Sequence, residues 1–95
     1  MNKPEVWNIV ISDLAQKTLD KIDRKWANKI TDYIYSRVAN GIDPRRFGHA
    51  LAYDKYGIWR YRVGDYRILC EIFDTELRIV AVEIGHRKDI YKDKK

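Results

Sequence analysis

The spacing of apolar residues changes midway along this chain, and the change restricts the fold more than any single motif does. From Ile58 to Val63, from Tyr66 to Phe73 and from Leu77 to Gly85, the pattern has the period of two that is typical of strands. The segments between these runs, Gly64-Asp65 and Asp74-Thr75-Glu76, are short enough for antiparallel hairpins. The second half of the chain therefore predicts a three-stranded meander.

The first half predicts a strand followed by two helices. Val6 to Ser12 alternates as a strand does, with three large apolar side chains on one face: Trp7, Ile9 and Ile11. Helical spacing follows from Leu14 to Ile22 and again from Trp26 to Val38, with a break near Asp23 to Lys25. Together the two helices predict a helical hairpin.

The boundaries of these elements carry their own signals. Ser12 or Asp13 is expected to cap the first helix, and Asn40-Gly41 is expected to end the second. An irregular stretch is expected from Asp43 to about Tyr56, and a last helical turn from Arg87 to Lys92. The predicted fold class is α+β, an antiparallel β-sheet packed on an N-terminal helical hairpin in the order β-α-α-β-β-β, within one domain over residues 1–95.

Composition narrows the functional classes. Cys70 is the single cysteine, which excludes an intramolecular disulfide and a cysteine cluster for a metal. No apolar run approaches the ~20 residues of a membrane span. The segment Met1 to Pro4 lacks the apolar stretch of a secretory signal. We expect a cytoplasmic protein that uses no metal or other cofactor.

The charge favours a polyanionic partner. Nineteen Lys and Arg residues against fourteen Asp and Glu give a net charge of +5. Lysines dominate before Pro44, whereas arginines, which suit bidentate phosphate contacts, dominate after it: Arg45, Arg46, Arg60, Arg62, Arg67, Arg78 and Arg87.

The first predicted hairpin brings two arginines face to face. If its loop is Gly64-Asp65, Arg62 lies opposite Arg67. If its loop is Val63-Gly64, Arg60 lies opposite Arg67 instead. Like charges directly opposite are destabilising, so either register favours an anion site. The alternative is an ordinary charged sheet face, neutralised by Asp65 and Glu71.

The segment from Gly85 to Tyr91 adds three groups with relevant chemistry. Gly85 ends the last strand, His86 is a side chain suited to move a proton, and Arg87 is suited to hold a phosphate, with Tyr91 about one helical turn beyond it. Alternatively, this segment is a solvated tail whose tyrosine packs on the domain.

These residue types fit metal-independent cleavage of RNA. Attack by a 2′-hydroxyl requires removal of its proton, stabilisation of a phosphorane with extra negative charge, and protonation of the leaving oxygen. Arginines meet the second need, and His86 or Tyr91 is a candidate for the first or third. An aromatic ring also stacks on a splayed base.

Other residues are assigned to the surface or the core. His49 is expected to be a surface residue rather than a second base. Cys70 is expected to be an inert buried thiol. The tryptophans are expected to serve the core: Trp7, Trp26 and Trp59.

Two motifs together resemble the RelE branch of the RelE/ParE toxin superfamily. They are the run from Trp59 to Ile68, read WRYRVGDYRI, and the end of the third strand, Ile84-Gly85-His86-Arg87, closing on Tyr91. The helical hairpin also lies where this family has it, so the resemblance covers nearly the whole chain. It implies a ribosome-dependent endoribonuclease that cleaves mRNA in the A site and is held inactive by a separate antitoxin protein.

The resemblance also implies roles for individual residues. Arg67 matches a catalytic arginine, Arg87 an arginine that supports the phosphate, and Tyr91 a tyrosine that stacks on the substrate base. Arg60 stands where well-studied members carry a lysine. The expected catalytic set is thus Arg60, Arg67, His86, Arg87 and Tyr91, and the expected RNA-binding set is Arg45, Arg46, Arg62 and Lys88.

The chain departs from the family pattern at the proton acceptor. The well-studied members have two lysines on this strand, where this chain has Ile58 and Arg60, and its spacing from Arg87 to Tyr91 is shorter. Arginine stays protonated, so Arg60 cannot act as a general base. The remaining candidates are His86, a group of the ribosome, or no dedicated base.

Two other functions share the expected fold. One is a ParE-like toxin that inhibits DNA gyrase by protein binding without cutting RNA. The other is a binding domain whose basic face contacts only an antitoxin.

Overall fold

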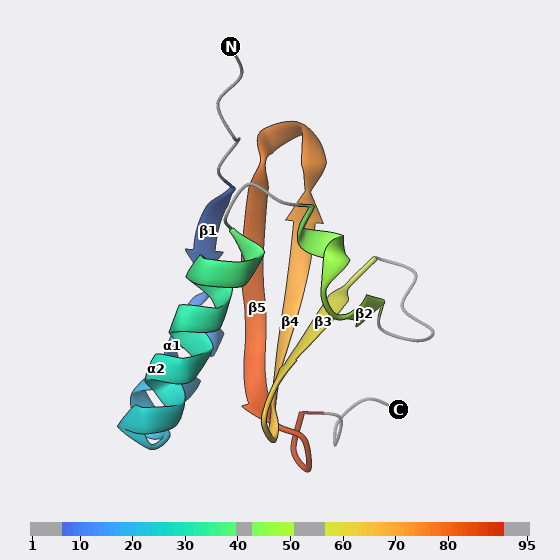
Figure 1. The fold of residues 1–95 in the computed structure, drawn as a ribbon. Coiled ribbons are helices and arrows are strands. Elements are labelled where there is room, and N and C mark those ends of the chain that lie inside the picture. The colour runs from blue at the N-terminus through green and yellow to red at the C-terminus, as the bar shows by residue number, and fades with distance from the viewer. Residues whose placement is uncertain (1–6, 40–42, 51–56, 91–95) are drawn as a thin grey trace.

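A computed structural model describes residues 7–39, 43–50 and 57–90 of the chain. Figure 1 shows two helices beside a twisted sheet. In chain order the elements are β1 (Asn8–Ile11), α1 (Asp13–Lys21), α2 (Arg24–Tyr33), the π-helical turn η1 (Ile34–Val38), the 3-10 turn η2 (Pro44–Arg46), β2 (His49–Ala50), β3 (Trp59–Val63), β4 (Tyr66–Phe73), the 3-10 turn η3 (Asp74–Glu76) and β5 (Arg78–His86).

The sheet confirms the predicted α+β class and differs from the prediction in two respects. Its strand order is β1-β5-β4-β3-β2, and β3, β4 and β5 form the predicted antiparallel meander. However, β1 runs parallel to β5, with Asn8 opposite Arg78, so the sheet is mixed rather than wholly antiparallel. In addition, the stretch predicted to be irregular contains β2, a two-residue strand that pairs with β3.

The first helix begins as the sequence predicts, whereas α2 begins at Arg24, within the predicted break from Asp23 to Lys25. Ser12 caps α1, because its side chain accepts a hydrogen bond from the backbone N–H of Ala15 at 3.0 Å. Asp23 caps α2 in the same way, accepting from Lys25 at 2.8 Å. The helical path continues to Val38 but changes from α to π after Tyr33, and the predicted end at Asn40-Gly41 lies outside the described residues.

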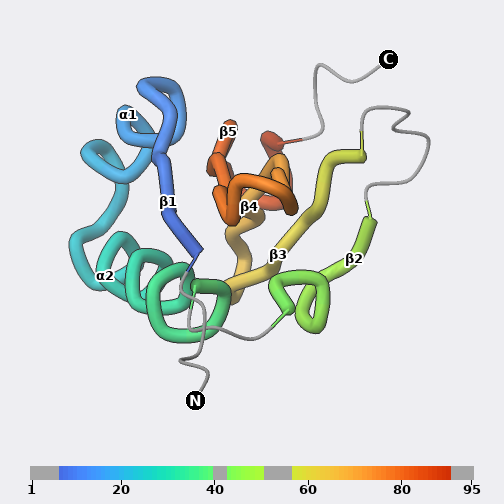
Figure 2. Tube along the Cα trace, turned by 90° about the horizontal axis from the view of Figure 1, so that it is seen from above, coloured from blue at the N-terminus to red at the C-terminus, as the bar shows by residue number. Residues whose placement is uncertain are grey.

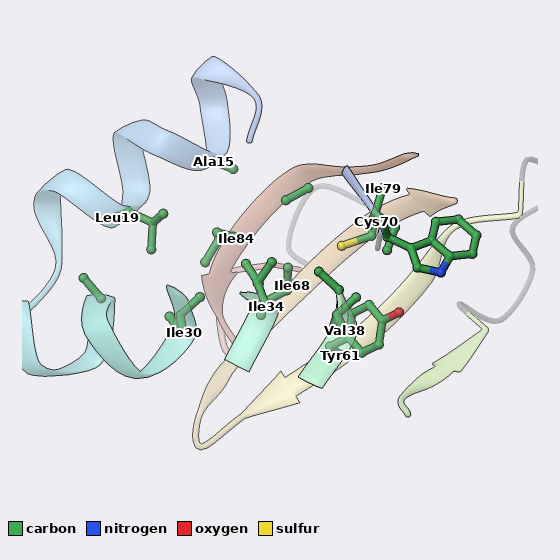
Figure 3. Close-up of a cluster of buried hydrophobic side chains, with 14 residues drawn as sticks. Ala15, Leu19, Ile30, Ile34, Val38, Tyr61, Ile68, Cys70, Ile79 and Ile84 are labelled. Atoms are coloured by element: carbon green, nitrogen blue, oxygen red, sulfur yellow. The ribbon is translucent and has the colours of Figure 1, made fainter. Parts of the chain in front are cut away.

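The helices cover one face of the sheet, and the core lies between the helices and this face (Figures 2 and 3). The buried apolar side chains of α1, α2 and η1 meet those of β3, β4 and β5: Ala15, Leu19, Ile30, Ile34, Val38, Tyr61, Ile68, Cys70, Ile79 and Ile84. Burial raises the pKa of the Cys70 thiol to about 12, which confirms an inert buried thiol.

The three tryptophans differ in their position relative to the core. Trp7 is part of the core, and Trp59 packs against it while half-buried. Trp26 lies outside the core cluster, against the loop of the β3–β4 hairpin, where its ring is 5.7 Å from that of Tyr66. The prediction that all three serve the core is therefore wrong for Trp26, which docks the hairpin onto α2.

Candidate anion-binding site

The loop of the β3–β4 hairpin determines which arginines face each other. Val63 pairs with Tyr66, so the loop is Gly64-Asp65 and Arg62 lies directly opposite Arg67. Gly64 has a φ of +59°, and a Cβ on it would overlap the Trp26 ring. The turn and its docking against α2 therefore fix this register rather than the alternative one.

Arg67 is held by the backbone of its own hairpin. Its Nη1 donates to the carbonyl oxygens of Gly64 at 3.1 Å and Tyr66 at 3.2 Å. Within the described part of the chain, neither Asp65 nor Glu71 forms an ion pair with Arg62 or Arg67. The neutralised sheet face considered from the sequence is therefore not what this hairpin presents.

These arginines line a cavity of about 290 Å³ beside the edge of the sheet. Arg60 and Arg62 are two residues apart on β3 and therefore share a face, opposite to buried Tyr61. The described residues that line the cavity contain no carboxylate: Tyr33, Gly48, His49, Arg60, Arg62 and Arg67. Three guanidinium groups line this cavity and the described part of its wall supplies no carboxylate, an arrangement suited to an anion with several oxygens, such as a phosphate.

His49 and Tyr33 line the cavity although the sequence did not place either of them in the site. The position of His49 depends on β2. It is exposed, as predicted, but pairing of β2 with β3 places it opposite Arg60. The preceding Gly48 has a φ of +78°, and a Cβ there would overlap the carbonyl oxygen of Arg60. Glycine thus allows β2 to approach β3 closely. A two-residue strand gives no periodic signal, so the sequence placed His49 in a loop.

A hydrogen bond from β3 reinforces this approach. The indole Nε1 of Trp59 donates to the carbonyl oxygen of Phe47 at 2.5 Å. The chain leading into Gly48 is therefore tied to the same strand that carries Arg60.

The described part of the predicted C-terminal turn, residues 87–90, attaches to the hairpin loop, and none of these residues lines the arginine cavity. The backbone N–H of Arg87 donates to the carbonyl oxygen of Asp65 at 2.6 Å. The Asp65 carboxylate lies 3.6 Å from Nε of Arg87 and 3.9 Å from Nε2 of His86. A hydrogen bond from the N–H of Ile90 to the carbonyl oxygen of His86 closes one helical turn, within the predicted segment.

The lone pair of the His86 ring is already engaged. Its Nδ1 accepts a hydrogen bond from the backbone N–H of Lys88 at 3.1 Å, so in the neutral ring the proton belongs on Nε2, facing Asp65. His86 lines a second cavity, of about 460 Å³, together with charged residues of both signs: Lys21, Glu83 and Asp89.

The other predicted RNA contacts are spread over the surface. Arg45 forms a two-pronged ion pair with Asp74 at 2.8 and 3.0 Å, and its hydrogen bond holds the pKa of that carboxyl below its usual range. Arg46 and Lys88 are exposed, and neither lines the arginine cavity. Tyr91 lies outside the described residues.

The described residues show neither a metal site nor a membrane-spanning helix. Over residues 7–39, 43–50 and 57–90, no group of three or more His, Cys, Asp or Glu side chains is placed to hold a metal ion. Within the same ranges, no helix has the length and apolarity needed to cross a membrane.

Comparisons with known proteins agree on the kind of protein this chain resembles. Residues 9–91 match the family model for the ParE toxin of type II toxin–antitoxin systems, parDE. The chain is 26% identical to Toxin RelE of Mycobacterium tuberculosis (strain ATCC 25618 / H37Rv) over 92 residues, which are 97% of this chain and 93% of that protein. It is 24% identical to Toxin RelG of the same organism over 86 residues, which are 90% of this chain and 97% of that protein.

Solved structures share the fold. The toxin–antitoxin complex RelBE2 from Mycobacterium tuberculosis contains a chain that superposes with a TM-score of 0.78 at 22% identity, covering 94% of this chain and 100% of that one. In the intact E. coli RelBE toxin–antitoxin complex the corresponding values are 0.66 and 10%, with coverage of 84% and 95%.

Proposed function

Since the chain belongs to the ParE toxin family of type II toxin–antitoxin systems, we propose that it is a RelE-like endoribonuclease that cleaves mRNA in the ribosomal A site. The reaction is attack of a 2′-hydroxyl on the adjacent phosphate, and its consequence is inhibition of translation in the cytoplasm. The observation that carries this proposal is the cavity formed by Arg60, Arg62 and Arg67.

The arginines supply what the phosphorane needs. Arg62 and Arg67 lie directly opposite, where like charges are destabilising by themselves and a bound phosphate offsets the repulsion. Arg67 is already oriented by two backbone carbonyls, so it needs no rearrangement as charge develops on the phosphate. Arg87 adds positive charge from the C-terminal turn next to this hairpin.

His49 is the better placed of the two histidines to take the proton. It shares the cavity with the arginines, whereas Nδ1 of His86 is engaged by Lys88 and its Nε2 faces Asp65. A general base must reach the proton that it removes, and the position of His49 in the cavity supports it for this role. We therefore assign proton abstraction to His49 and keep His86 as the competing assignment.

We also propose that a separate antitoxin protein holds the chain inactive. The related solved structures from Mycobacterium tuberculosis and E. coli are toxin–antitoxin complexes. An acidic partner segment that covers the arginine cavity would neutralise the site by the same contacts that bind phosphate.

The test is mapping of 5′ ends on cellular mRNA after brief induction. The wild type should produce cuts within ribosome-bound codons, and Arg67→Ala should not. Arg24→Ala is the matched control, because Arg24 is exposed at the start of α2 and does not line the cavity. Equal cutting by the Arg67→Ala variant would overturn the assignment of the site.

The same induction, with DNA damage measured beside mRNA cleavage, distinguishes RNA cleavage from the ParE-like alternative. The matching family model carries the ParE name, whereas the curated relatives and the structural neighbours carry the RelE and RelG names. DNA damage on induction, with mRNA left intact, would mean inhibition of gyrase instead of RNA cleavage.

A further inference from the structure

One aromatic side chain in the arginine cavity has no part in the function proposed so far. Tyr33, the last residue of α2, lines the cavity with the three arginines and His49. Among the described lining residues it is the one that a helix contributes, since Gly48 precedes β2 and the others lie on β2, β3 and β4. We propose that the Tyr33 hydroxyl donates a hydrogen bond to the scissile phosphate beside Arg62 and Arg67, an inference that rests on the proposed function.

Packing fixes the ring of Tyr33. It meets the ring of Tyr61 edge-on, with centroids 6.0 Å apart and planes at 61°. Tyr61 is itself immobilised, because it is fully buried and its hydroxyl donates to the carbonyl oxygen of Pro44 at 2.6 Å. A ring held by a rigid neighbour presents its hydroxyl in a defined direction at little entropic cost.

Tyr33 remains a donor at neutral pH. Burial raises the pKa of its phenol, and the charge of Arg37 opposes this only in part. The hydroxyl therefore stays protonated while a phosphate occupies the cavity.

A neutral donor complements the arginines. Their charges attract any polyanion from a distance, whereas a phenol gains only when an acceptor oxygen sits at hydrogen-bond distance. Tyr33 would therefore act on the precise placement of the phosphate within the codon, more than on recruitment of the RNA.

The experiment compares two single-atom changes in the full-length protein. Tyr33→Phe removes the hydroxyl and keeps the ring against Tyr61. Tyr35→Phe is the matched control, because Tyr35 lies on η1, is 52% exposed and does not line the cavity. The rate is measured in a single turnover on ribosomes programmed with a defined mRNA, and thermal unfolding is followed in parallel.

We expect Tyr33→Phe to cleave about 10- to 100-fold more slowly, as the loss of a hydrogen bond to a charged group predicts. Tyr35→Phe should cleave at the wild-type rate, and the melting temperature of both variants should stay unchanged. Binding is measured on mRNA that cannot be cleaved because its target nucleotide carries a 2′-deoxy sugar. The affinity of Tyr33→Phe for these programmed ribosomes should fall by no more than the same 10- to 100-fold.

Three outcomes would overturn the inference. Wild-type cleavage by Tyr33→Phe, with Arg67→Ala inactive, would overturn this inference and leave the proposed function standing. If Tyr33→Phe cleaves at the wild-type rate while Tyr33→Leu cleaves slowly, the contribution of Tyr33 comes from the packing of its ring and not from its hydroxyl. No cleavage by the wild-type protein would overturn the proposed function and this inference with it.

Discussion

The arginine cavity and the C-terminal turn both gather basic side chains, but the two regions handle the charge differently. In the cavity, Arg62 lies opposite Arg67, and the described lining residues contain no acid. In the turn, His86 and Arg87 both face the carboxylate of Asp65. Among the described residues, the wall of the cavity carries charge of a single sign, whereas the turn pairs its positive charges with a carboxylate.

We interpret this difference as that between a binding site and a structural contact. Like charges directly opposite each other, such as Arg62 and Arg67, lower the stability of the fold, and a bound anion offsets this repulsion. Positive side chains that already face a carboxylate, such as His86 and Arg87, are stabilised less by binding an external phosphate. The cavity should therefore be the chemical centre, and the turn should support it from the side.

Removal of two arginine side chains from the cavity should have the largest effect on cleavage and is the strongest test of the difference between the two regions. The double change Arg62→Ala and Arg67→Ala should slow cleavage on programmed ribosomes by about 10³-fold, because the loss of even one preorganised donor costs about 10²–10³ in rate. Relief of the Arg62–Arg67 repulsion should at the same time raise the free energy of unfolding by up to about 1 kcal/mol.

The opposite signs of these two effects are diagnostic. A protein that is inactive because it has unfolded would lose both activity and stability, whereas removal of an anion site loses only activity. A double variant that cleaves like the wild type would place the chemistry elsewhere, with the C-terminal turn as the first candidate.

The two histidines allow a sharper version of the comparison. His49→Ala should slow cleavage by about 10²-fold or more, the usual contribution of a general base, while His86→Ala should have a smaller effect. Single-turnover rates of the two variants on the same ribosomes measure the difference directly. The reverse order of effects would move the proton acceptor to the C-terminal turn and restore the assignment made from sequence.

The parts of the fold and of the cavity differ in how well the sequence predicts them. The meander and the helical hairpin were predictable because their signals are local: the period of apolar residues, the caps and the two-residue loop. The facing arginines followed from that same loop. The parallel pairing of β1 with β5 depends on contacts between residues 70 positions apart, such as Asn8 and Arg78, and no local pattern encodes it.

The position of His49 was hidden for a related reason. β2 contains two residues, fewer than a periodic pattern needs. Its pairing depends on the positive φ of Gly48 and on the hydrogen bond from Trp59 to Phe47, both of which are tertiary features. The cavity was therefore predictable on its β3–β4 side and not on its β2 side.

Gly48 gives the next prediction, on the side of the cavity that the sequence did not reveal. Gly48→Ala should lower the free energy of unfolding by about 1–3 kcal/mol, because alanine is strained at a φ of +78° and its Cβ would overlap the Arg60 carbonyl oxygen. Denaturant unfolding measures the loss. Gly57→Ala is the matched control, since Gly57 has a similar φ of +76° but a Cβ there meets nothing within 4 Å.

The two glycines separate backbone strain from displacement of His49. Both variants should lose stability through strain, but only Gly48→Ala should also lose cleavage at temperatures where it remains folded. Equal cleavage by the two variants would mean that the approach of β2 to β3 does not matter for the reaction.

The smallest effect is expected at Asp65, which links the two regions. Its contacts with His86 and Arg87, at 3.9 and 3.6 Å, are surface pairs, with Asp65 63% and Arg87 56% exposed, so Asp65→Asn should change stability by at most about 1 kcal/mol. The backbone hydrogen bond from Arg87 to Asp65 does not involve the side chain and remains in the variant. Cleavage should therefore change by only a few-fold, and raising the salt concentration should reduce the difference further. Cleavage that falls as far as in Arg67→Ala would show that the C-terminal turn belongs to the chemical centre, because only precise placement of Arg87 could make so exposed a carboxylate essential.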